Sequence, residues 1–301
     1  MIHIVTNHHE TLRWLKLQSY FLAKNTPPEH EYRVYCGVTD IDAKRQEGLE
    51  EVLDSGLPTL ANHTFFKLEN VINNHGTKLD ELSKIVIEQG DWSPDDLLIF
   101  IDPDAFPIEN TWLHFLMEAL RGKSLLKDFP GGCPLIAISR EENPEPLLKD
   151  ELKPYPHPCF CATTVGYWKE KKLSWKIDPS RRIETAGVIL KELVEEEDNW
   201  GRLLRTNCYN LHPLNFGVYG HFIYHHGSGN RPTYDSADIW SRPQLAEKYG
   251  VSLDLHFPNL PIFNDRLSNL VYEAIHKDEN FIHMYFSGKE RGTHVNYEVG
   301  T

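Results

Sequence analysis

Leu97-Leu98-Ile99-Phe100-Ile101 leads directly into Asp102-Pro103-Asp104. An unbroken apolar run predicts a strand buried on both faces, because a strand with one face in water would alternate apolar and polar side chains. Such a strand lies near the centre of a sheet that helices cover on both sides. The acidic turn that follows it then lies at the carboxyl edge of the sheet, where open α/β sheets bind ligands.

The rest of the chain supports this fold class. Short apolar runs alternate with amphipathic stretches, which is the pattern of βα units that build a mainly parallel sheet. Strands are expected at 2–6, 32–38, 97–101, 134–139, 160–168 and 220–224. Apolar residues at helical spacing predict helices at 11–24, 78–89, 111–121, 187–196, 243–249 and 267–277. Residues 141–158, rich in proline and charge, are expected to form a loop. We therefore predict an α/β fold with three α/β/α layers, in a single domain over residues 1–301.

Composition excludes several classes of protein. The net charge is −13, and no run of Lys and Arg forms a basic arm, which argues against nucleic acid as a partner. No window approaches 18 uninterrupted apolar residues, so we expect no transmembrane segment. The first residues lack the basic start and apolar stretch of a signal peptide, and the five scattered cysteines suit a reducing compartment. A cytoplasmic location is therefore expected.

Asp102 and Asp104 are the candidate metal ligands of the first half of the chain. Two carboxylates on one tight turn repel each other unless a cation offsets their charge. Mg²⁺ and Mn²⁺ prefer oxygen ligands and can bridge such a pair to phosphate oxygens, while Pro103 stiffens the turn. The alternative is an exposed acidic turn that only ends a strand.

The stretch from Leu97 to Ile108 resembles the DxD segment of glycosyltransferases with the GT-A fold. In that family a buried strand precedes the acids and an apolar residue and a proline follow them. The resemblance extends over residues 1–231 as a series of motifs. It implies a Rossmann-like GT-A domain, a donor that is a nucleotide sugar, with a UDP-sugar the first expectation, and a carbohydrate or glycoconjugate acceptor. Residues 1–125 would bind the donor, while residues 126–301 would complete the metal site and shape the acceptor side.

Further donor contacts are implied by position. Thr6 and Asn7 follow the first strand where GT-A enzymes meet the base and ribose, and Asp40 follows the second strand like an acid that reads the base. Asn74 and Gly76 resemble a glycine-bearing loop that lies along the donor. Each of these residues has an alternative role as a turn or helix-cap residue.

A histidine from a late strand commonly completes the metal site in this family, and the segment from Tyr224 to Arg231 is similar to that feature. His225 and His226 are both candidate ligands, since strand phase leaves open which of them faces the metal. Arg231 would neutralise the leaving diphosphate. The alternative is a histidine-rich loop without a ligand.

Glu184 is the candidate general base, because it precedes a predicted helix where inverting GT-A enzymes present a carboxylate to the acceptor hydroxyl. Its alternative role is to start that helix, and Asp178 is a second candidate base. An inverting transfer is the prediction. The spacing from His226 to Arg231 is also similar to that of retaining families, although one residue shorter.

Two other classes of function remain open. A nucleotidyltransferase or phosphohydrolase could use the same acid pair, but a sugar-activating nucleotidyltransferase would carry a glycine-rich basic loop where this chain has Asn7-His8-His9-Glu10. A sugar-binding module is the non-enzyme alternative, and it would have little use for the acids, the late histidines and Glu184 together.

Overall fold

The computed structural model of the chain describes the following residues: 1–9, 14–39, 50, 56–68, 75–122, 132–140, 155–176, 189, 199–203 and 217–226. In chain order the elements are β1 (Ile2–His9), α1 (Leu15–Asn25), β2 (Tyr32–Thr39), the 3₁₀ helix η1 (Pro58–Leu60), β3 (His63–Lys67), α3 (His75–Gln89), β4 (Leu97–Ile101), β5 (Ala105–Pro107), α4 (Trp112–Leu120), β6 (Leu135–Arg140), β7 (Tyr155–Thr164), α5 (Val165–Glu170), β8 (Gly201–Leu203), β9 (Gly217–Tyr219) and β10 (Ile223–His225).

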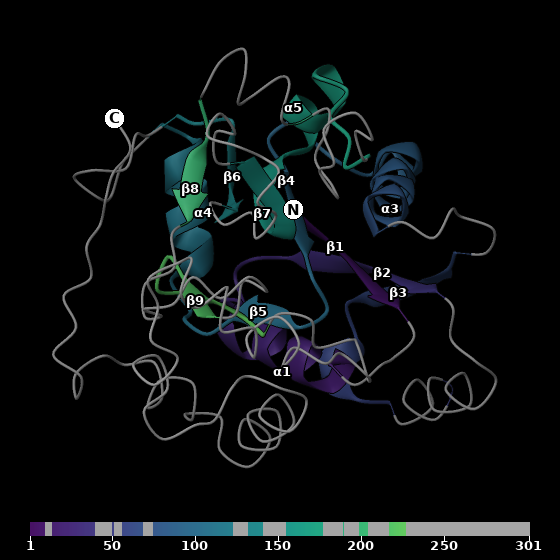
Figure 1. Cartoon of the computed structure of the whole chain (residues 1–301). Coiled ribbons are helices and arrows are strands. Elements are labelled where there is room, and N and C mark those ends of the chain that lie inside the picture. The colour runs from purple at the N-terminus through teal and green to yellow at the C-terminus, as the bar shows by residue number, and fades with distance from the viewer. Residues whose placement is uncertain are drawn as a thin grey trace, which may run out of the picture.

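A seven-stranded sheet with the order β3-β2-β1-β4-β7-β6-β8 forms the centre of the described structure (Figure 1). Strands β3, β2, β1 and β4 are parallel, β7 is antiparallel to both of its neighbours, and β6 and β8 are parallel to each other. The predicted mainly parallel α/β sheet is confirmed, with β4 as its middle strand. The chain leaves β1 in one direction to form β2 and β3 and then returns to the other side of β1 with β4, so the order of strands reverses at β1 and β4.

Apolar side chains cover both faces of this sheet, and the run in β4 contributes to both. Ile99 and Ile101 pack in one core with residues of α1 and α4, such as Leu15 and Trp112. Leu98 and Phe100 pack in a second core with residues of α3 and α5. Helices α1 and α3 accordingly lie on opposite sides of β1 and β2 (Figure 1). The three-layer arrangement expected from the unbroken apolar run is therefore confirmed.

A second, three-stranded sheet has the order β5-β10-β9. β10 pairs antiparallel with both neighbours, and Ala105 of β5 lies opposite His225 of β10. This sheet begins immediately after the acidic turn, so it carries a late segment of the chain back to the end of β4.

The predicted strand at 160–168 was wrong in its second half. β7 ends at Thr164, and residues 165–170 form the short helix α5. The Oγ1 atom of Thr164 accepts a hydrogen bond from the backbone N of Tyr167, at 3.2 Å, which is the usual N-cap interaction of a helix. The apolar residues Val165 and Trp168 are three apart and pack in the core from this helix.

Two further boundaries differ from the predictions. The expected loop at 141–158 overlaps the start of β7, which begins at Tyr155. The expected strand at 220–224 is instead a turn at Gly220 and His221, both with positive φ, followed by β10 from Ile223. The predicted helices at 187–196, 243–249 and 267–277 lie outside the described residues, apart from Ile189.

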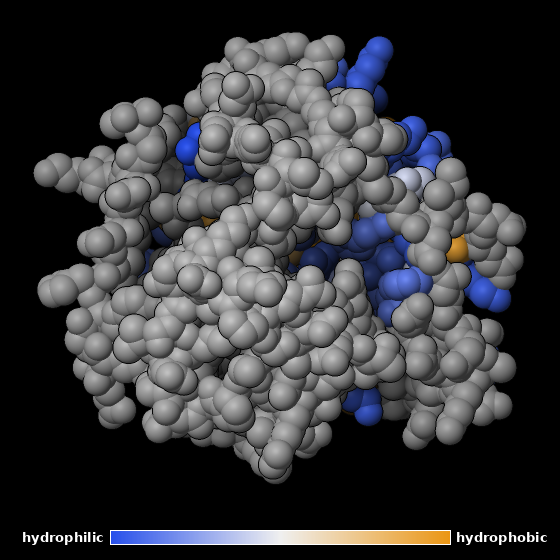
Figure 2. Space-filling view, viewed as in Figure 1, coloured by the Kyte–Doolittle hydropathy of each residue, from blue (hydrophilic) through white to orange (hydrophobic). Residues whose placement is uncertain are grey.

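The described surface is mostly polar. Tyr20 is the one large hydrophobic residue exposed within the described part of the chain, and the described residues visible in Figure 2 are mainly hydrophilic. Within that same part, no helix is long and apolar enough to cross a membrane.

Candidate metal and nucleotide site

The acidic turn is a hydrogen-bonded β-turn at the carboxyl end of β4. The backbone N of Ala105 donates to the carbonyl of Asp102 at 3.0 Å, which places Pro103 and Asp104 at the two central positions. Proline suits the first central position because its φ is already fixed near the required value. The backbone N of Asp102 donates to the carbonyl of Cys159 in β7, also at 3.0 Å, so the turn is attached to the central sheet.

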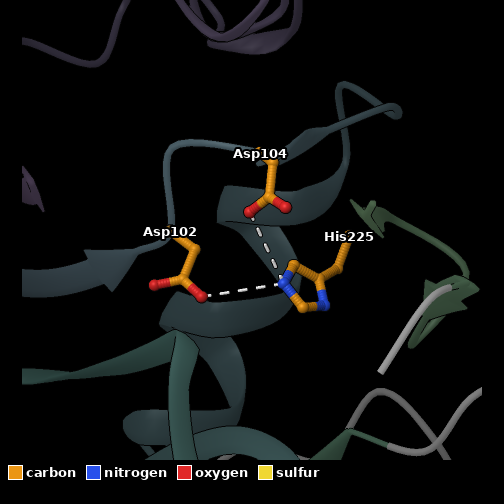
Figure 3. Close-up of side chains that lie close together, drawn as sticks. All are labelled: Asp102, Asp104 and His225. Atoms are coloured by element: carbon orange, nitrogen blue, oxygen red, sulfur yellow. Dashed lines mark ion pairs between the residues drawn. The ribbon is translucent and has the colours of Figure 1, made fainter. Parts of the chain in front are cut away.

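The pairing of β5 with β10 brings His225 to this turn. Ala105 and His225 are opposite each other, and the backbone N of His226 donates to the carbonyl of Asp104 at 3.0 Å. His225 is therefore adjacent to the acid pair in space although it is more than a hundred residues away in sequence. Figure 3 shows the imidazole of His225 and the two carboxylates pointing toward one another.

The three side chains form a cluster with the dimensions of a divalent metal site. His225 Nε2 lies 3.6 Å from Asp102 Oδ2 and 3.6 Å from Asp104 Oδ1, and one ligand atom from each residue lies within 4.8 Å of the others. With bonds of about 2.1 Å, octahedral ligand atoms are about 3 Å apart at neighbouring vertices and about 4 Å apart at opposite vertices. Two carboxylates and an imidazole at these separations suit Mn²⁺ or Mg²⁺.

His226 does not face the carboxylates. Its Nδ1 lies 2.8 Å from the hydroxyl oxygen of Tyr224, and its ring packs against Trp14, with ring centroids 4.4 Å apart. Consecutive residues of an extended strand point to opposite sides, so only one of the two histidines can face the turn. The structure therefore brings His225 to the acid pair, while His226 packs against Trp14 and Tyr224.

His75 was not among the predicted site residues, yet it contacts Asp102 from α3. Its Nε2 lies 2.9 Å from Asp102 Oδ1, on the side of the carboxylate opposite His225. Burial disfavours a charged ring, but the negative charge of Asp102 outweighs burial and raises the pKa of His75. Burial likewise disfavours the charged carboxylate of Asp102, and the nearby charges of His75 and His225 outweigh it and hold the pKa of Asp102 well below its usual range.

Thr6 and Asn7 are at the carboxyl end of β1, next to β4, where the order of strands reverses. Both are fully buried, and Asn7 Nδ2 donates to Thr39 Oγ1 of β2 at 3.4 Å. Within the described part of the chain, Thr6 Oγ1 and Asn7 Oδ1 have no hydrogen-bond partner. Consecutive residues of a strand point to opposite faces, so Thr6 lies on the face of Ile4 and Asn7 on the face of Val5. Buried polar atoms rarely remain unpaired, so each of the two is a candidate to bind a polar group on its own side of the sheet edge.

Lys78 is a second residue that the sequence did not single out. Its side chain is only 2% exposed, and its Nζ lies 3.0 Å from Thr39 Oγ1 and 3.4 Å from His9 Nδ1. Lysine is almost never fully buried unless its charge is compensated. The first turn of α3 therefore places an amine beside the carboxyl ends of β1 and β2.

Gly76 was predicted in a loop before the helix but lies in the first turn of α3. The helix begins at His75 and not at Lys78. A Cβ atom at Gly76 would lie 2.0 Å from the carbonyl oxygen of Trp175. Glycine is thus required here for the close approach of α3 to another backbone segment. The predicted residues Asp40, Asn74, Glu184 and Arg231 lie outside the described residues.

No family model matches this sequence, and no curated protein does. Among solved structures the chain is similar to galactosyltransferase LgtC in complex with donor and acceptor sugar analogues, at 12% identity and a TM-score of 0.43, over 83% of this chain and 95% of that one. It is also similar to TarS of S. aureus in complex with UDP-GlcNAc, at 11% identity and a TM-score of 0.46, over 97% and 76% of the two chains.

A third similar structure is the mannosyltransferase PcManGT from Pyrobaculum calidifontis in complex with GDP-Man and Mn²⁺, at 10% identity and a TM-score of 0.39, over 56% of this chain and 46% of that one. These proteins are GT-A glycosyltransferases, the family that the acidic segment of this sequence resembles. Likeness at this distance assigns no role to any residue.

Proposed function

We propose that this protein is a metal-dependent glycosyltransferase that transfers a sugar from a nucleotide-diphosphate donor to an acceptor hydroxyl. The observation that carries the proposal is the cluster of Asp102, Asp104 and His225 at the carboxyl edge of the sheet, beside the buried polar end of β1. A ligand that spans these two features has a polar part next to Thr6 and Asn7 and an anionic part next to the metal ligands. A nucleotide sugar has both parts.

Asp102, Asp104 and His225 would hold Mn²⁺ or Mg²⁺. When bound, the ion would neutralise the negative charge that develops on the leaving nucleoside diphosphate. His75 would hold the Asp102 carboxylate from its far side, so that Oδ2 faces Asp104 and His225. Metal ligands are commonly oriented by such a second contact.

The polar residues near the ends of β1 and β2 would bind the rest of the donor. Lys78 would donate to an oxygen of the diphosphate or ribose, and Thr6 and Asn7 would bind the nucleoside. Asp40, Asn74, Gly76 and Arg231 stay predictions as donor contacts. A UDP-sugar is the proposed donor, on the strength of the resemblance of the acidic segment to the DxD segment.

The proposed transfer is inverting, with Glu184 as the general base that takes the proton of the acceptor hydroxyl. The acceptor is a carbohydrate or a glycoconjugate. We assign both steps to one domain, in which residues 1–125 bind the donor and residues 126–301 contribute His225 and the acceptor side. A retaining transfer is the alternative, and the stereochemistry of the product distinguishes the two.

A reducing, cytoplasmic location is part of the proposal. Cys36, Cys133, Cys159 and Cys161 are all buried and free of disulfides. Buried thiols of this kind are typical of proteins that fold in a reducing compartment.

The first test is binding of UDP by calorimetry, with and without Mn²⁺. Wild-type protein should bind UDP in the presence of Mn²⁺, and Asp104→Ala should abolish the metal-dependent part of the affinity. Asp95→Ala is the matched control, because Asp95 is an exposed acid just ahead of the same strand and should leave binding unchanged. Equal UDP affinity for wild type and Asp104→Ala would overturn the metal-site assignment.

Measuring UDP release from a UDP-sugar, with and without an acceptor, then distinguishes the remaining candidate functions. Release of UDP from a UDP-sugar only when an acceptor sugar is present identifies a transferase. Release without acceptor identifies a phosphohydrolase, and binding without turnover identifies a sugar-binding module.

A further inference from the structure

Gln18 of α1 holds the acidic turn from the face of the sheet opposite α3. Its side chain is fully buried, and its Nε2 donates to the carbonyl of Asp102 at 2.7 Å and to the carbonyl of Ala105 at 3.0 Å. These carbonyls belong to the first and last residues of the β-turn. One side-chain amide therefore bridges the two ends of the turn that carries both candidate metal-binding carboxylates.

The chemistry of the contacts fixes the orientation of this amide. A carbonyl oxygen accepts hydrogen bonds, so only the NH₂ group of Gln18 can lie within 3.0 Å of two of them. Both hydrogens of the group are then used. The carbonyl oxygen of the amide, Gln18 Oε1, is buried and has no hydrogen-bond partner among the described residues.

Other hydrogen bonds also hold the backbone of the turn, among them the one from the Asp102 N–H to the carbonyl of Cys159 in β7. Pro103 has no N–H, the Ala105 N–H closes the turn onto Asp102, and the carbonyl of Asp104 accepts from His226. The Asp102 carbonyl, with two acceptor sites, takes both the Ala105 N–H and the Gln18 amide. Gln18 is thus the side chain that links the two ends of the turn to a separate helix.

We propose that Gln18 is a positioning residue for the metal site, which sets the backbone separation of Asp102 and Asp104 and so the affinity for the divalent ion. This inference rests on the proposed function. It assigns Gln18 no contact with the metal or the donor, and its effect passes through the two carbonyls. Without these two hydrogen bonds from Gln18, both carboxylates would remain on the turn, but the distance between them would vary more.

Asn25 supplies a matched control within the same helix. It is also a buried amide of α1, and its Nδ2 donates to the carbonyl of Pro107, at 2.8 Å, at the far end of β5. Gln18→Met and Asn25→Leu each remove a buried amide that binds a carbonyl of the same segment and retain nearly the same side-chain volume. If Gln18 only joined α1 to β5, the two variants would behave alike.

The experiment measures Mn²⁺ affinity without donor, by calorimetry and by electron paramagnetic resonance of free Mn²⁺, together with the melting temperature in EDTA. We expect Gln18→Met to weaken Mn²⁺ binding about tenfold or more, the usual effect of losing a group that orients metal ligands. Asn25→Leu should bind Mn²⁺ like wild type. Both variants should lower the melting temperature in EDTA by similar amounts.

Each outcome decides between these ideas. Unchanged Mn²⁺ affinity of Gln18→Met overturns the positioning role, and equal weakening in both variants shows a general effect of loosening α1, which overturns it too. Failure of wild-type protein to bind Mn²⁺ would instead overturn the proposed function, and the inference with it. Should Gln18→Met not fold, Gln18→Ala, which keeps a good helix former in α1, is judged by the same criteria.

Discussion

Asp102 is engaged on both of its carboxylate oxygens. His75 lies against Oδ1 at 2.9 Å, and His225 lies 3.6 Å from Oδ2. The closer distance on the His75 side is that of a direct ion pair, whereas 3.6 Å leaves room for an ion between the partners. Under the proposed function, His75 would therefore hold the carboxylate and His225 would share a cation with it.

Lys78 should contribute to donor binding but not to metal binding. Lys78→Met removes the amine near Thr39 and His9 while retaining the length of the side chain. A hydrogen bond to a charged group contributes about 1.5–3 kcal/mol, so UDP affinity at saturating Mn²⁺ should fall about 10- to 100-fold. Calorimetry measures both affinities.

Lys84→Met is the control for this change. Lys84 is on the exposed side of the same helix and is paired with Glu81, so its loss should leave UDP affinity unchanged. Equal UDP affinity of Lys78→Met and wild type would remove Lys78 from the donor site.

His8 should make the protein less stable in acid. Burial lowers the pKa of His8 to about 3, so the ring stays neutral in the folded state, while in the unfolded chain it takes up a proton below its ordinary pKa of 6.5. Its contribution to stability is full above pH 6.5 and is lost as the pH falls from there toward 3. Between pH 7 and pH 5 this loss amounts to about 2 kcal/mol.

Urea unfolding in EDTA at pH 7 and pH 5 checks the contribution of His8. In His8→Leu, the fall in unfolding free energy between the two pH values should be smaller than in wild type by about 2 kcal/mol. His114→Leu, at an exposed position of α4, should retain the wild-type fall. An identical fall in His8→Leu and wild type would contradict the assignment.

At the scale of elements, α3 is fixed by its contact with residues 174–175. Asp80 Oδ1 accepts from the backbone N of Trp175 at 2.8 Å, and Asp80 Oδ2 accepts from the hydroxyl of Ser174. One turn earlier, Gly76 leaves no room for a Cβ atom against the carbonyl oxygen of Trp175. Because His75 precedes Gly76 and Lys78 follows it in the same first turn of α3, this packing also sets the position of both residues.

Gly76→Ala should therefore destabilise the fold by about 1–3 kcal/mol, the range for overpacking, and should also weaken UDP binding. Urea unfolding and calorimetry measure the two effects. The Asp80→Asn variant weakens the anchor and should let the Trp175 segment move away. Gly76→Ala should consequently cost less stability in the Asp80→Asn background than in wild type, whereas strictly additive losses would argue against the steric explanation.

Much of this architecture could be predicted from local patterns. The apolar run of β4 predicted a central strand, and the acids after it predicted where the candidate site lies. Helix α5 was harder to predict. Apolar residues at Val165 and Trp168 are compatible with a strand as well as with a short helix, and a threonine such as Thr164 is only a weak signal for the start of a helix. Similarly, periodicity showed which face of α3 is buried but not that Lys78, a polar residue, belongs to it.

The site as a whole depends on contacts between distant segments. Which histidine faces the acid pair is decided by the register of β10 against β5, and the sequence of either strand alone does not contain that register. Gln18, His75 and His225 approach one turn from α1, α3 and β10. Residues that act through tertiary contacts of this kind have no spacing rule by which they could be found in sequence.

For the whole molecule, the candidate metal site joins the end of β4 to β10, and under the proposed function Mn²⁺ should therefore stabilise the fold. A ligand that binds only the folded state adds about 2.7 kcal/mol at a concentration 100 times its dissociation constant. Melting temperature in Mn²⁺ should exceed that in EDTA, and the excess should grow with Mn²⁺ concentration. Differential scanning fluorimetry measures both.

His225→Ala measures how much of this stabilisation depends on the link between β10 and the acidic turn. This variant keeps both carboxylates on the turn but loses the only ligand of the cluster that β10 supplies. Its melting temperature should respond weakly to Mn²⁺, while His114→Ala should respond like wild type. If His225→Ala gained as much from Mn²⁺ as wild type, the ion would be bound by the turn alone, and β10 would not belong to the metal site.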